Sequence, residues 1–334
     1  MSTRLTRIAG TGHYLPERVV TNADLEKIMD TSDEWIQERT GIRERRFVEP
    51  GTGSSDLGYR AALVALEEAG WQPDDVDFII FATLSADYYF PGNGVLLQNM
   101  LGVGPIGALD VRNQCSGFMY GITVADSMIR SGQYDRILLV GAEVHSSGLN
   151  LSTEGRDTAV LFGDGGGAAC LEVTDGSDGS RLLSHYLHSD GTYAEDLCMR
   201  VPSARMNPVI SHEMIDSGIH YPHMNGREVF KHAITKFPAV IKEALEAENL
   251  EPEDLTLIIP HQANERITEA LRKRMGLPDE RVFSNIARYG NTTAGSIPIA
   301  LSEAVKSELI SRGDLVCLVA FGSGFTWAST LLHY

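Results

Sequence analysis

Two stretches of this chain carry the same pattern 179 residues apart. Residues 61–80 read AALVALEEAGWQPDDVDFII, and residues 240–259 read VIKEALEAENLEPEDLTLII. Seven of the twenty positions are identical, and most of the others keep their apolar or acidic character. Each copy has the apolar spacing of a helix, then a turn at Pro-Asp or Pro-Glu, then a short apolar run typical of a buried strand.

The same offset recurs at other places in the chain. It pairs RILLV at 136–140 with LVCLV at 315–319, and it pairs residues 8–12 with residues 187–191. A general likeness between any two α/β units would explain one such match, but it would hardly preserve a constant offset. We therefore expect an internal duplication.

The duplication predicts the fold class. In each half, helical patterns alternate with short runs of consecutive apolar residues, which are typical of strands covered on both faces. We expect an α/β protein made of two stacked halves related by a pseudo-twofold axis. The first half would span residues 1–177 and the second residues 178–334, with the junction in the Gly/Ser/Asp-rich stretch 175–180.

Three long excursions interrupt the regular pattern, at residues 29–47, 85–99 and 194–225. Each has the character of loops and short helices. Because long connections on a rigid α/β core usually build the binding site, we expect these segments to line it.

Composition excludes several classes of function. The 334 residues carry a formal net charge of −17, from 28 Lys and Arg against 45 Asp and Glu. This balance argues against general binding to nucleic acid or anionic membranes, since phosphates would be repelled. The apolar runs are far shorter than the roughly 20 residues of a membrane-spanning helix. Four widely spaced cysteines and no secretory signal at the N-terminus predict a protein of the reducing cytoplasm.

Cys115 is a candidate nucleophile. It stands where a strand pattern ending in DVRNQ runs into a helical pattern. The partial positive charge of a helix N-terminus favours the thiolate form of a cysteine at such an elbow. A buried structural cysteine would fit the same pattern. Cys170 and Cys317 lie inside apolar strand patterns, where a structural role is the simpler interpretation.

His261 and Asn291 are candidates from the second half. His261 directly follows a predicted strand, and ligands bind at the carboxyl ends of strands in open α/β sheets. Asn291 lies in a turn before a helix, where a lone Asn is usually a cap. However, Cys115 corresponds to Ala294 at the offset of 179, so the helices after Cys115 and Asn291 are counterparts. The pseudo-twofold axis then brings the three side chains together, in a set suited to holding an acyl thioester and stabilising a negative oxygen.

Two other patterns do not predict a cofactor. His212, His220 and His223 lie in one excursion, but they lack a metal-ligand spacing and a carboxylate partner, so no metal is expected. GDGGGA at 163–168 matches a dinucleotide-binding pattern. It leads into a strand pattern rather than a helix, so we do not expect a nucleotide cofactor.

Taken together, the motifs resemble the thiolase-fold condensing enzymes, and most closely the β-ketoacyl-acyl-carrier-protein synthase III family. The resemblance covers essentially the whole chain. Its markers are DEWIQERTGIR at 33–43, CSGF at 115–118, FGDG at 162–165, PHQAN at 260–264, GNT at 290–292 and FGSGFTW at 321–327. It implies a thiolase-like fold with αβαβα layers.

The resemblance also implies a reaction that initiates fatty acid synthesis and needs no cofactor. Cys115 would take an acyl group from acyl-coenzyme A, while the backbone N–H groups of Cys115 and Ser323 hold the oxyanion. Malonyl-acyl carrier protein would then lose carbon dioxide. A neutral His261 and the Asn291 amide would stabilise the resulting enolate, which attacks the acyl-cysteine and gives a 3-oxoacyl-carrier protein.

Binding residues are implied in the same way. Coenzyme A binding is assigned by the resemblance to Trp35, Arg39, Thr40, Arg156 and Asn264. Docking of an acidic carrier protein is expected at basic residues that stand out in this acidic chain, although a solvated helix face would look similar: Lys231, Arg266, Arg272, Lys273 and Arg274. Phe90 resembles the residue that extends into the partner's acyl pocket in family dimers, which predicts a homodimer.

Departures from the family pattern leave the primer open. Gln114, Arg227 and Ser323 differ from the residues common at these positions, and the excursion 194–225 is longer than in the plainest members. An alternative is therefore a condensing enzyme or acyltransferase of secondary metabolism that uses the same triad. A catalytically silent partner subunit is disfavoured by the intact triad, and a cysteine hydrolase gives Asn291 no role.

Overall fold

The computed structural model describes residues 4–334, in which two mixed sheets form the framework. The first sheet has the strand order β1-β7-β6-β4-β5 and the second has the order β11-β12-β13-β8. The first contains β1 (Leu5–Tyr14), β4 (Phe78–Ala82), β5 (Gly107–Val111), β6 (Arg136–Glu143) and β7 (Gly165–Thr174). The second contains β8 (Arg181–Ser189), β11 (Leu257–Pro260), β12 (Leu315–Gly322) and β13 (Thr326–His333).

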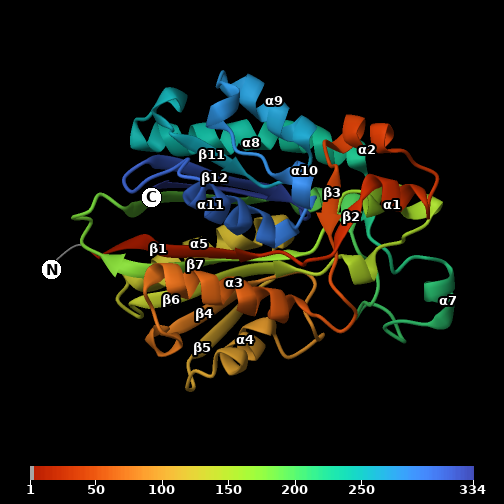
Figure 1. The fold of residues 1–334 in the computed structure, drawn as a ribbon, viewed down its shortest axis with the longest axis horizontal. Coiled ribbons are helices and arrows are strands. Elements are labelled where there is room, and N and C mark those ends of the chain that lie inside the picture. The colour runs from red at the N-terminus through yellow and green to blue at the C-terminus, as the bar shows by residue number, and fades with distance from the viewer. Residues whose placement is uncertain (1–3) are drawn as a thin grey trace.

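Helices separate and cover the two sheets (Figure 1). Two of them lie between the sheets, α5 (Gly117–Arg130) and α11 (Ser296–Lys306). The outer face of the first sheet is covered by α3 (Ser54–Ala69) and α4 (Asn93–Leu101), and that of the second by α8 (Gly226–Glu248) and α9 (Glu265–Met275). This arrangement confirms the α/β class and the αβαβα layers.

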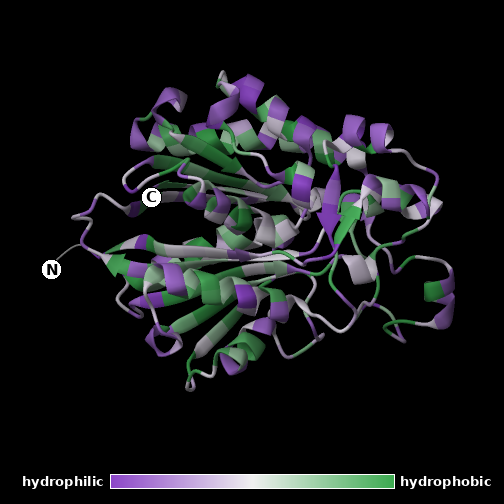
Figure 2. Cartoon of the chain, viewed as in Figure 1, coloured by the Kyte–Doolittle hydropathy of each residue, from purple (hydrophilic) through white to green (hydrophobic). Residues whose placement is uncertain are grey.

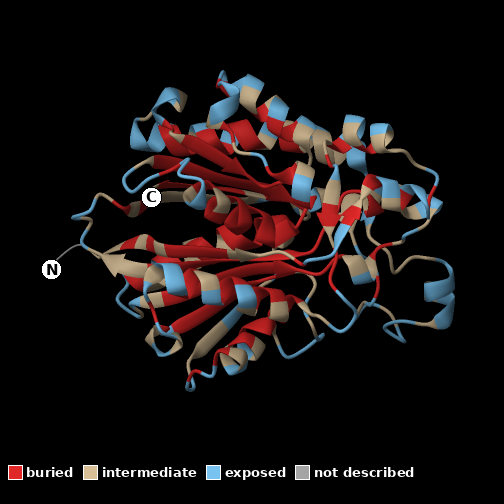
Figure 3. Cartoon of the chain, in the orientation of Figure 1, coloured by how far each residue is buried: buried red, intermediate tan, exposed pale blue. Residues whose placement is uncertain are grey.

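The layers follow from the side-chain pattern. Every residue of β4 and of β12 is buried, because helices lie on both faces of these strands. The central core joins α5 and α11 to the facing strands of both sheets through residues such as Phe118, Ile122, Ile297 and Leu301. Hydrophobic and buried residues accordingly concentrate in the sheets and the middle helices, whereas the outer helices turn hydrophilic, exposed residues to solvent (Figures 2 and 3).

The predicted offset of 179 residues relates several pairs of elements in the structure. It separates β6 from β12 at both ends, and it separates the start of α5 from the start of α11. It also separates two 3₁₀ turns, η2 (Gln114–Ser116) and η8 (Thr293–Gly295). Gln114 and Thr293, the first residues of these turns, have φ values of 43° and 49°. Both helices thus begin at the same tight elbow, a backbone conformation that side-chain-bearing residues seldom adopt.

The offset does not extend to the first strand of each half, where the predicted match is wrong. Through the sheet registers, His13 aligns with Gly141 across β7, and Leu187 aligns with Ala320 across β13. Positions 141 and 320 differ by 179, but positions 13 and 187 differ by only 174. β1 and β8 occupy equivalent edges of their sheets. From that strand to the end of the next long helix, the chain is therefore five residues longer in the second half, and α8 is itself longer than α3.

Most of the smaller elements gather at one end of the molecule, on the right in Figure 1. They are β2 (Val19–Thr21), α1 (Asn22–Glu26), α2 (Asp33–Thr40), β3 (Glu44–Arg46), α6 (Arg156–Ala159), β9 (Leu197–Cys198), α7 (His212–Asp216), β10 (His223–Met224) and α10 (Ile286–Tyr289). The excursion 194–225 contains β9, α7 and β10. The predicted junction lies in the connection between β7 and β8, and the division into halves at residue 177 remains a prediction.

Candidate active site

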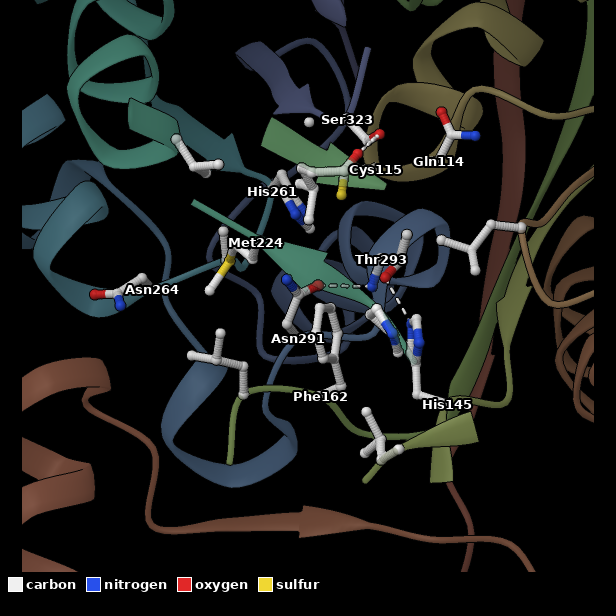
Figure 4. A pocket seen from close by; sticks show the side chains of 18 of the residues that line it. Gln114, Cys115, His145, Phe162, Met224, His261, Asn264, Asn291, Thr293 and Ser323 are labelled. Atoms are coloured by element: carbon white, nitrogen blue, oxygen red, sulfur yellow. Dashed lines mark hydrogen bonds between the residues drawn. The ribbon is translucent and has the colours of Figure 1, made fainter. Parts of the chain in front are cut away.

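The three residues of the predicted triad line one cavity of about 1040 Å³. Cys115 belongs to η2, His261 directly follows β11, and Asn291 lies between α10 and η8. Figure 4 shows the thiol of Cys115 directed towards the space between the His261 ring and the Asn291 amide. The fold therefore brings a cysteine from the first sheet's side of the molecule to a histidine and an asparagine that follow it by well over 100 residues.

The Cys115 side chain is packed closely against the end of β12. A Cβ atom on Gly322 would lie 2.5 Å from Cys115 Cβ and 2.8 Å from Sγ, so only glycine leaves room for the thiol. Burial and the nearby Glu143 carboxylate raise the pKa of Cys115 to about 12, although the backbone N–H groups of Ser323 and Cys115 lower it. The expectation of a resting thiolate is therefore wrong, because desolvation outweighs the helix N-terminus.

The His261 ring is enclosed and has a single identified partner. Its Nδ1 atom lies 2.6 Å from Oγ of Ser296 on α11. Its buried Nε2 atom has no hydrogen-bond partner in the part of the chain that the structure describes. Burial, with a smaller contribution from His145, lowers the pKa of His261 to about 3, so the imidazole is neutral near pH 7. Because a hydroxyl can donate or accept, Ser296 can stabilise either neutral tautomer.

The Asn291 side chain is oriented by its own turn. Oδ1 accepts a hydrogen bond from the backbone N–H of Thr293 at 2.8 Å, so the Nδ2 amide points away from Thr293 and into the cavity (Figure 4). The backbone is fixed as well. The N–H of Asn291 donates to the carbonyl of Leu161 at 2.8 Å, and its carbonyl accepts from the N–H of Gly163 at 3.1 Å.

Ser323 directly follows β12 and lines the cavity. Its backbone N–H lies beside the Cys115 thiol, where it lowers the pKa of that group. Its hydroxyl donates to the carbonyl of Leu197 in β9. An oxygen bound next to the sulfur would meet the N–H groups of both Cys115 and Ser323, and paired backbone donors of this kind stabilise a tetrahedral oxyanion.

One end of the cavity is formed by α2 and the start of α9. Trp35, Arg39, Thr40 and Asn264 all line it. The guanidinium groups of Arg39 and Arg156 lie 4.6 Å and 5.0 Å from the ring centre of Trp35. The Asn264 amide donates to the carbonyl of Arg39 at 3.0 Å and so joins α9 to α2. Four of the five residues predicted to bind coenzyme A thus line this end, and the fifth, Arg156, lies against Trp35.

The five basic residues predicted to dock a carrier protein differ in their surroundings. Arg266 lines the cavity and lies over the ring of Phe230, and Arg274 donates to a backbone carbonyl. The other three are paired with carboxylates: Lys231 with Glu228, Arg272 with Asp279, and Lys273 with Glu269. The set therefore presents less unbalanced positive charge than its residue count suggests.

Phe90 is absent from the residues that line the cavity among those described. It lies in the connection between β4 and α4 and is 81% exposed, beside Tyr88 and Tyr89, which are 59% and 74% exposed. Three consecutive exposed aromatic residues leave a large apolar surface in contact with water. The predicted insertion of Phe90 into a partner's pocket remains a prediction.

Sequence reasoning missed three buried residues that support the triad, namely Thr293, Ser296 and Glu143. Thr293 and Ser296 look like ordinary polar residues at a helix start, so their contacts with Asn291 and His261 could not be recognised. Glu143 gave one signal, a buried charge at the end of a strand whose middle residues are apolar. The departures Gln114 and Arg227 line the cavity too, as do Leu197, Cys198, Met199, Pro222 and Met224 from the excursion 194–225.

Neither metal-binding clusters nor membrane helices were found in residues 4–334. No group of three or more His, Cys, Asp or Glu side chains there is arranged to hold a metal ion. No helix in the same range is both long and apolar enough to cross a membrane.

Comparison with known proteins agrees with this geometry. Models of 3-oxoacyl-[acyl-carrier-protein] synthase III match residues 109–191 and, for its C-terminal part, residues 245–334. The β-ketoacyl-[acyl-carrier-protein] synthase III of Caldanaerobacter subterraneus subsp. tengcongensis is 45% identical over 327 residues, which cover 98% of this chain and 97% of that protein.

Solved structures give the same result. The crystal structure of 3-oxoacyl-[acyl-carrier-protein] synthase III from Aquifex aeolicus VF5 has a TM-score of 0.90 at 42% identity, covering 98% of this chain and 100% of the other. The priming β-ketosynthase of the R1128 polyketide pathway has a TM-score of 0.89 at 31% identity, covering 99% and 97%. The full-length similarity and the matched models place this chain in the 3-oxoacyl-[acyl-carrier-protein] synthase III family.

Proposed function

We propose that this protein is a 3-oxoacyl-acyl-carrier-protein synthase III, which condenses an acyl-coenzyme A primer with malonyl-acyl carrier protein and so initiates fatty acid synthesis. One observation carries the proposal. A buried thiol with two backbone N–H groups beside it shares a cavity with an unpartnered imidazole nitrogen and an outward-facing amide. This is an arrangement for an acyl-enzyme on one side and an enolate on the other.

In the first half-reaction, the sulfur of Cys115 attacks the thioester carbon of the primer. The pKa of about 12 means that the thiol loses its proton only as the new bond forms. His261 is not the acceptor of that proton, because its Nε2 atom carries the hydrogen that the second half-reaction needs. The oxyanion rests on the N–H groups of Cys115 and Ser323. The bond to coenzyme A then breaks, and the departing sulfur takes the proton that Cys115 released.

In the second half-reaction, malonyl-acyl carrier protein loses carbon dioxide and leaves an electron pair on the thioester as an enolate. His261 Nε2–H and Asn291 Nδ2–H donate to the enolate oxygen, and each donor in such a dry site contributes about 3 kcal/mol. The enolate carbon attacks the acyl group on Cys115. The carbon–sulfur bond to the enzyme breaks, the thiol regains a proton, and 3-oxoacyl-carrier protein leaves.

Substrate binding follows from the lining of the cavity. The ring of Trp35 is flanked by Arg39 and Arg156, and a purine can stack on the ring in place of one guanidinium group. Asn264 and Thr40 would contact the pantetheine arm. Carrier-protein docking is expected around Arg266 at the cavity. No metal, nucleic acid or membrane partner is expected, and a cytoplasmic homodimer remains a prediction.

A priming synthase of secondary metabolism is the second candidate. It is favoured by the likeness to the R1128 priming β-ketosynthase and by Gln114 and Arg227 in the cavity lining. We prefer a role in fatty acid synthesis over one in secondary metabolism, because the relative at 45% identity is named a β-ketoacyl-[acyl-carrier-protein] synthase III.

The test is carbon dioxide release from malonyl-acyl carrier protein in the presence of acetyl- or longer acyl-coenzyme A. We expect release that depends on the primer and is matched by 3-oxoacyl-carrier protein. Absence of primer-dependent release with any acyl-coenzyme A would contradict the proposal. Acyl transfer to an oxygen or nitrogen acceptor without decarboxylation would instead indicate an acyltransferase of secondary metabolism.

A further inference from the structure

The duplicated framework contains a second elbow that has no nucleophile. Ala294 occupies in η8 the position that Cys115 occupies in η2, and the two residues are 179 apart. The strands beside the two elbows, β6 and β12, also end at positions that are 179 residues apart. β12 ends at Gly322 beside Cys115, whereas β6 ends at Glu143 beside Ala294. A glycine at the first elbow is thus replaced by a buried carboxylate at the second.

The backbone donors at the second elbow are occupied by side chains. The N–H groups that correspond to those of Cys115 and Ser323 belong to Ala294 and Val144. The N–H of Ala294 donates to Oε1 of Glu143 at 3.5 Å, and the N–H of Val144 donates to Oγ of Ser85 at 2.9 Å. The Ser85 hydroxyl in turn donates to Oε2 of Glu143 at 2.5 Å. Where the first elbow can hold a substrate oxygen, the second already holds a carboxylate and a hydroxyl.

The same carboxylate holds a segment of the cavity wall. Glu143 is fully buried and forms no ion pair with any described residue, so hydrogen-bond donors must stabilise its charge. Oε1 accepts from the N–H of Leu84 at 3.1 Å. Oε2 accepts from the Thr83 hydroxyl at 3.0 Å and from the N–H of Ser85 at 3.1 Å. Leu84 and Ser85 both line the cavity that contains Cys115.

We propose that Glu143 is a positioning residue that fills the duplicated anion site and thereby fixes Leu84 and Ser85 as the wall against which the primer's acyl chain packs. The proposal rests on the proposed function, because it concerns the acyl group that Cys115 accepts. It assigns a role to a buried carboxyl group that the reaction itself does not use. It also explains why only one of the two elbows can bind an oxyanion.

The geometry predicts what a neutral isostere would do. Oε1 accepts from the backbone N–H groups of Leu84 and Ala294, and Oε2 accepts from that of Ser85 and shares that of Leu84 at 3.2 Å. A glutamine at this position would place its NH₂ group against one of these donors, since it has only one accepting oxygen. The segment would then move away, and longer acyl chains, which reach the wall, would be affected more than an acetyl group.

The experiment measures acylation of Cys115 by intact-protein mass spectrometry with acetyl- and hexanoyl-coenzyme A. For Glu143→Gln we expect the ratio of the hexanoyl rate to the acetyl rate to fall by about tenfold, the loss of roughly one buried hydrogen bond. The matched control is Glu172→Gln. Glu172 lies in β7, opposite Arg136 at the far end of β6, and its carboxylate pairs with Arg7, so the ratio should stay at the wild-type value.

Ser85→Ala provides a second variant should Glu143→Gln fold poorly. It removes the hydroxyl that links Glu143 to Val144, and we expect the same direction of change, by about threefold. A ratio unchanged from wild type in a folded variant, or an equal change in Glu172→Gln, would overturn the proposal. Failure of the wild-type protein to accept even an acetyl group would instead overturn the proposed function.

Discussion

The Nδ1 atom of His261 and the hydroxyl of Ser296 lie 2.6 Å apart, and both side chains are buried. The bond links the residue after β11 to the first residue of α11 and directs the unpartnered Nε2 atom at the substrates. Ser296 is therefore expected to fix the ring position and, by donating its O–H to Nδ1, to favour the tautomer with hydrogen on Nε2, because a buried imidazole nitrogen left without a partner costs about 1 kcal/mol or more.

Ser296→Ala is expected to slow carbon dioxide release from malonyl-acyl carrier protein by about tenfold. The control is Ser302→Ala, which removes a hydroxyl on the same helix that contacts His13 at 2.9 Å. His13 is absent from the described residues that line the cavity. Stopped-flow measurement of decarboxylation should find the control close to wild type. Equal loss in both variants would show that Ser296 acts only through stability.

Buried histidines predict a loss of stability in acid. The pKa values of His261 and His145 in the native protein are about 3 and about 4, below the usual 6.5. As pH falls below 6.5, these two histidines bind protons in the unfolded chain but stay neutral in the native state. The free energy of unfolding therefore falls as the pH is lowered towards 4. Glu143 acts in the opposite sense, because its pKa of about 7 lets the native state hold a proton between pH 4.5 and 7.

His145→Leu tests the sign of this effect. The variant lacks one of the three histidines that take up protons on unfolding, since burial also lowers the pKa of His13 to about 4. The free energy of unfolding, measured in urea at pH 7, 6 and 5, should therefore fall less steeply than that of wild type. An equal or steeper fall in the variant would contradict the burial of a neutral ring at this position.

The basic residues on α8 and α9 predict a graded effect on carrier-protein binding. Arg266→Ala should raise the KM for malonyl-acyl carrier protein by about tenfold, since Arg266 lines the cavity and has no carboxylate partner among the described residues. Arg272→Ala should change it by about twofold at most, since Asp279 lies 2.8 Å from that guanidinium group. Titration over a range of salt concentrations checks the order, and a larger effect at Arg272 would overturn it.

The exposed aromatic run predicts a dimer whose contacts affect the primer. Phe90→Ala should alter the relative rates with acetyl- and hexanoyl-coenzyme A, because the large apolar side chain is expected to enter the partner's pocket. Leu309→Ala is a suitable control, as Leu309 is also exposed but lies after α11. Sedimentation velocity would establish the assembly. A monomeric wild-type protein, or an unchanged chain-length profile in Phe90→Ala, would contradict this expectation.

Local patterns and one repeat were sufficient to predict two α/β halves and the meeting of Cys115, His261 and Asn291, whereas the αβαβα layers and the roles of the three residues came from the family resemblance. The offset of 179 relates η2 to η8 and so places Cys115 near the turn of Asn291. The offset could not locate β1 and β8, the first strand of each half, because the length of chain from that strand to the end of the next long helix differs between the halves. It also could not give the pKa of Cys115, which depends on burial and on Glu143, or the contacts of Ser296, which join residues distant in the chain.

The proposed reaction assigns acylation to Cys115, and stabilisation of the enolate after decarboxylation to His261 and Asn291. Intact-protein mass spectrometry after incubation with acetyl-coenzyme A, combined with assay of carbon dioxide release, measures both half-reactions in Cys115→Ala, His261→Ala and Asn291→Ala. We expect no acylation in the first variant, and acylation without decarboxylation in the other two. If His261→Ala and Asn291→Ala failed to accept the acetyl group yet still decarboxylated malonyl-acyl carrier protein, the roles assigned to the two sides of the cavity would be wrong.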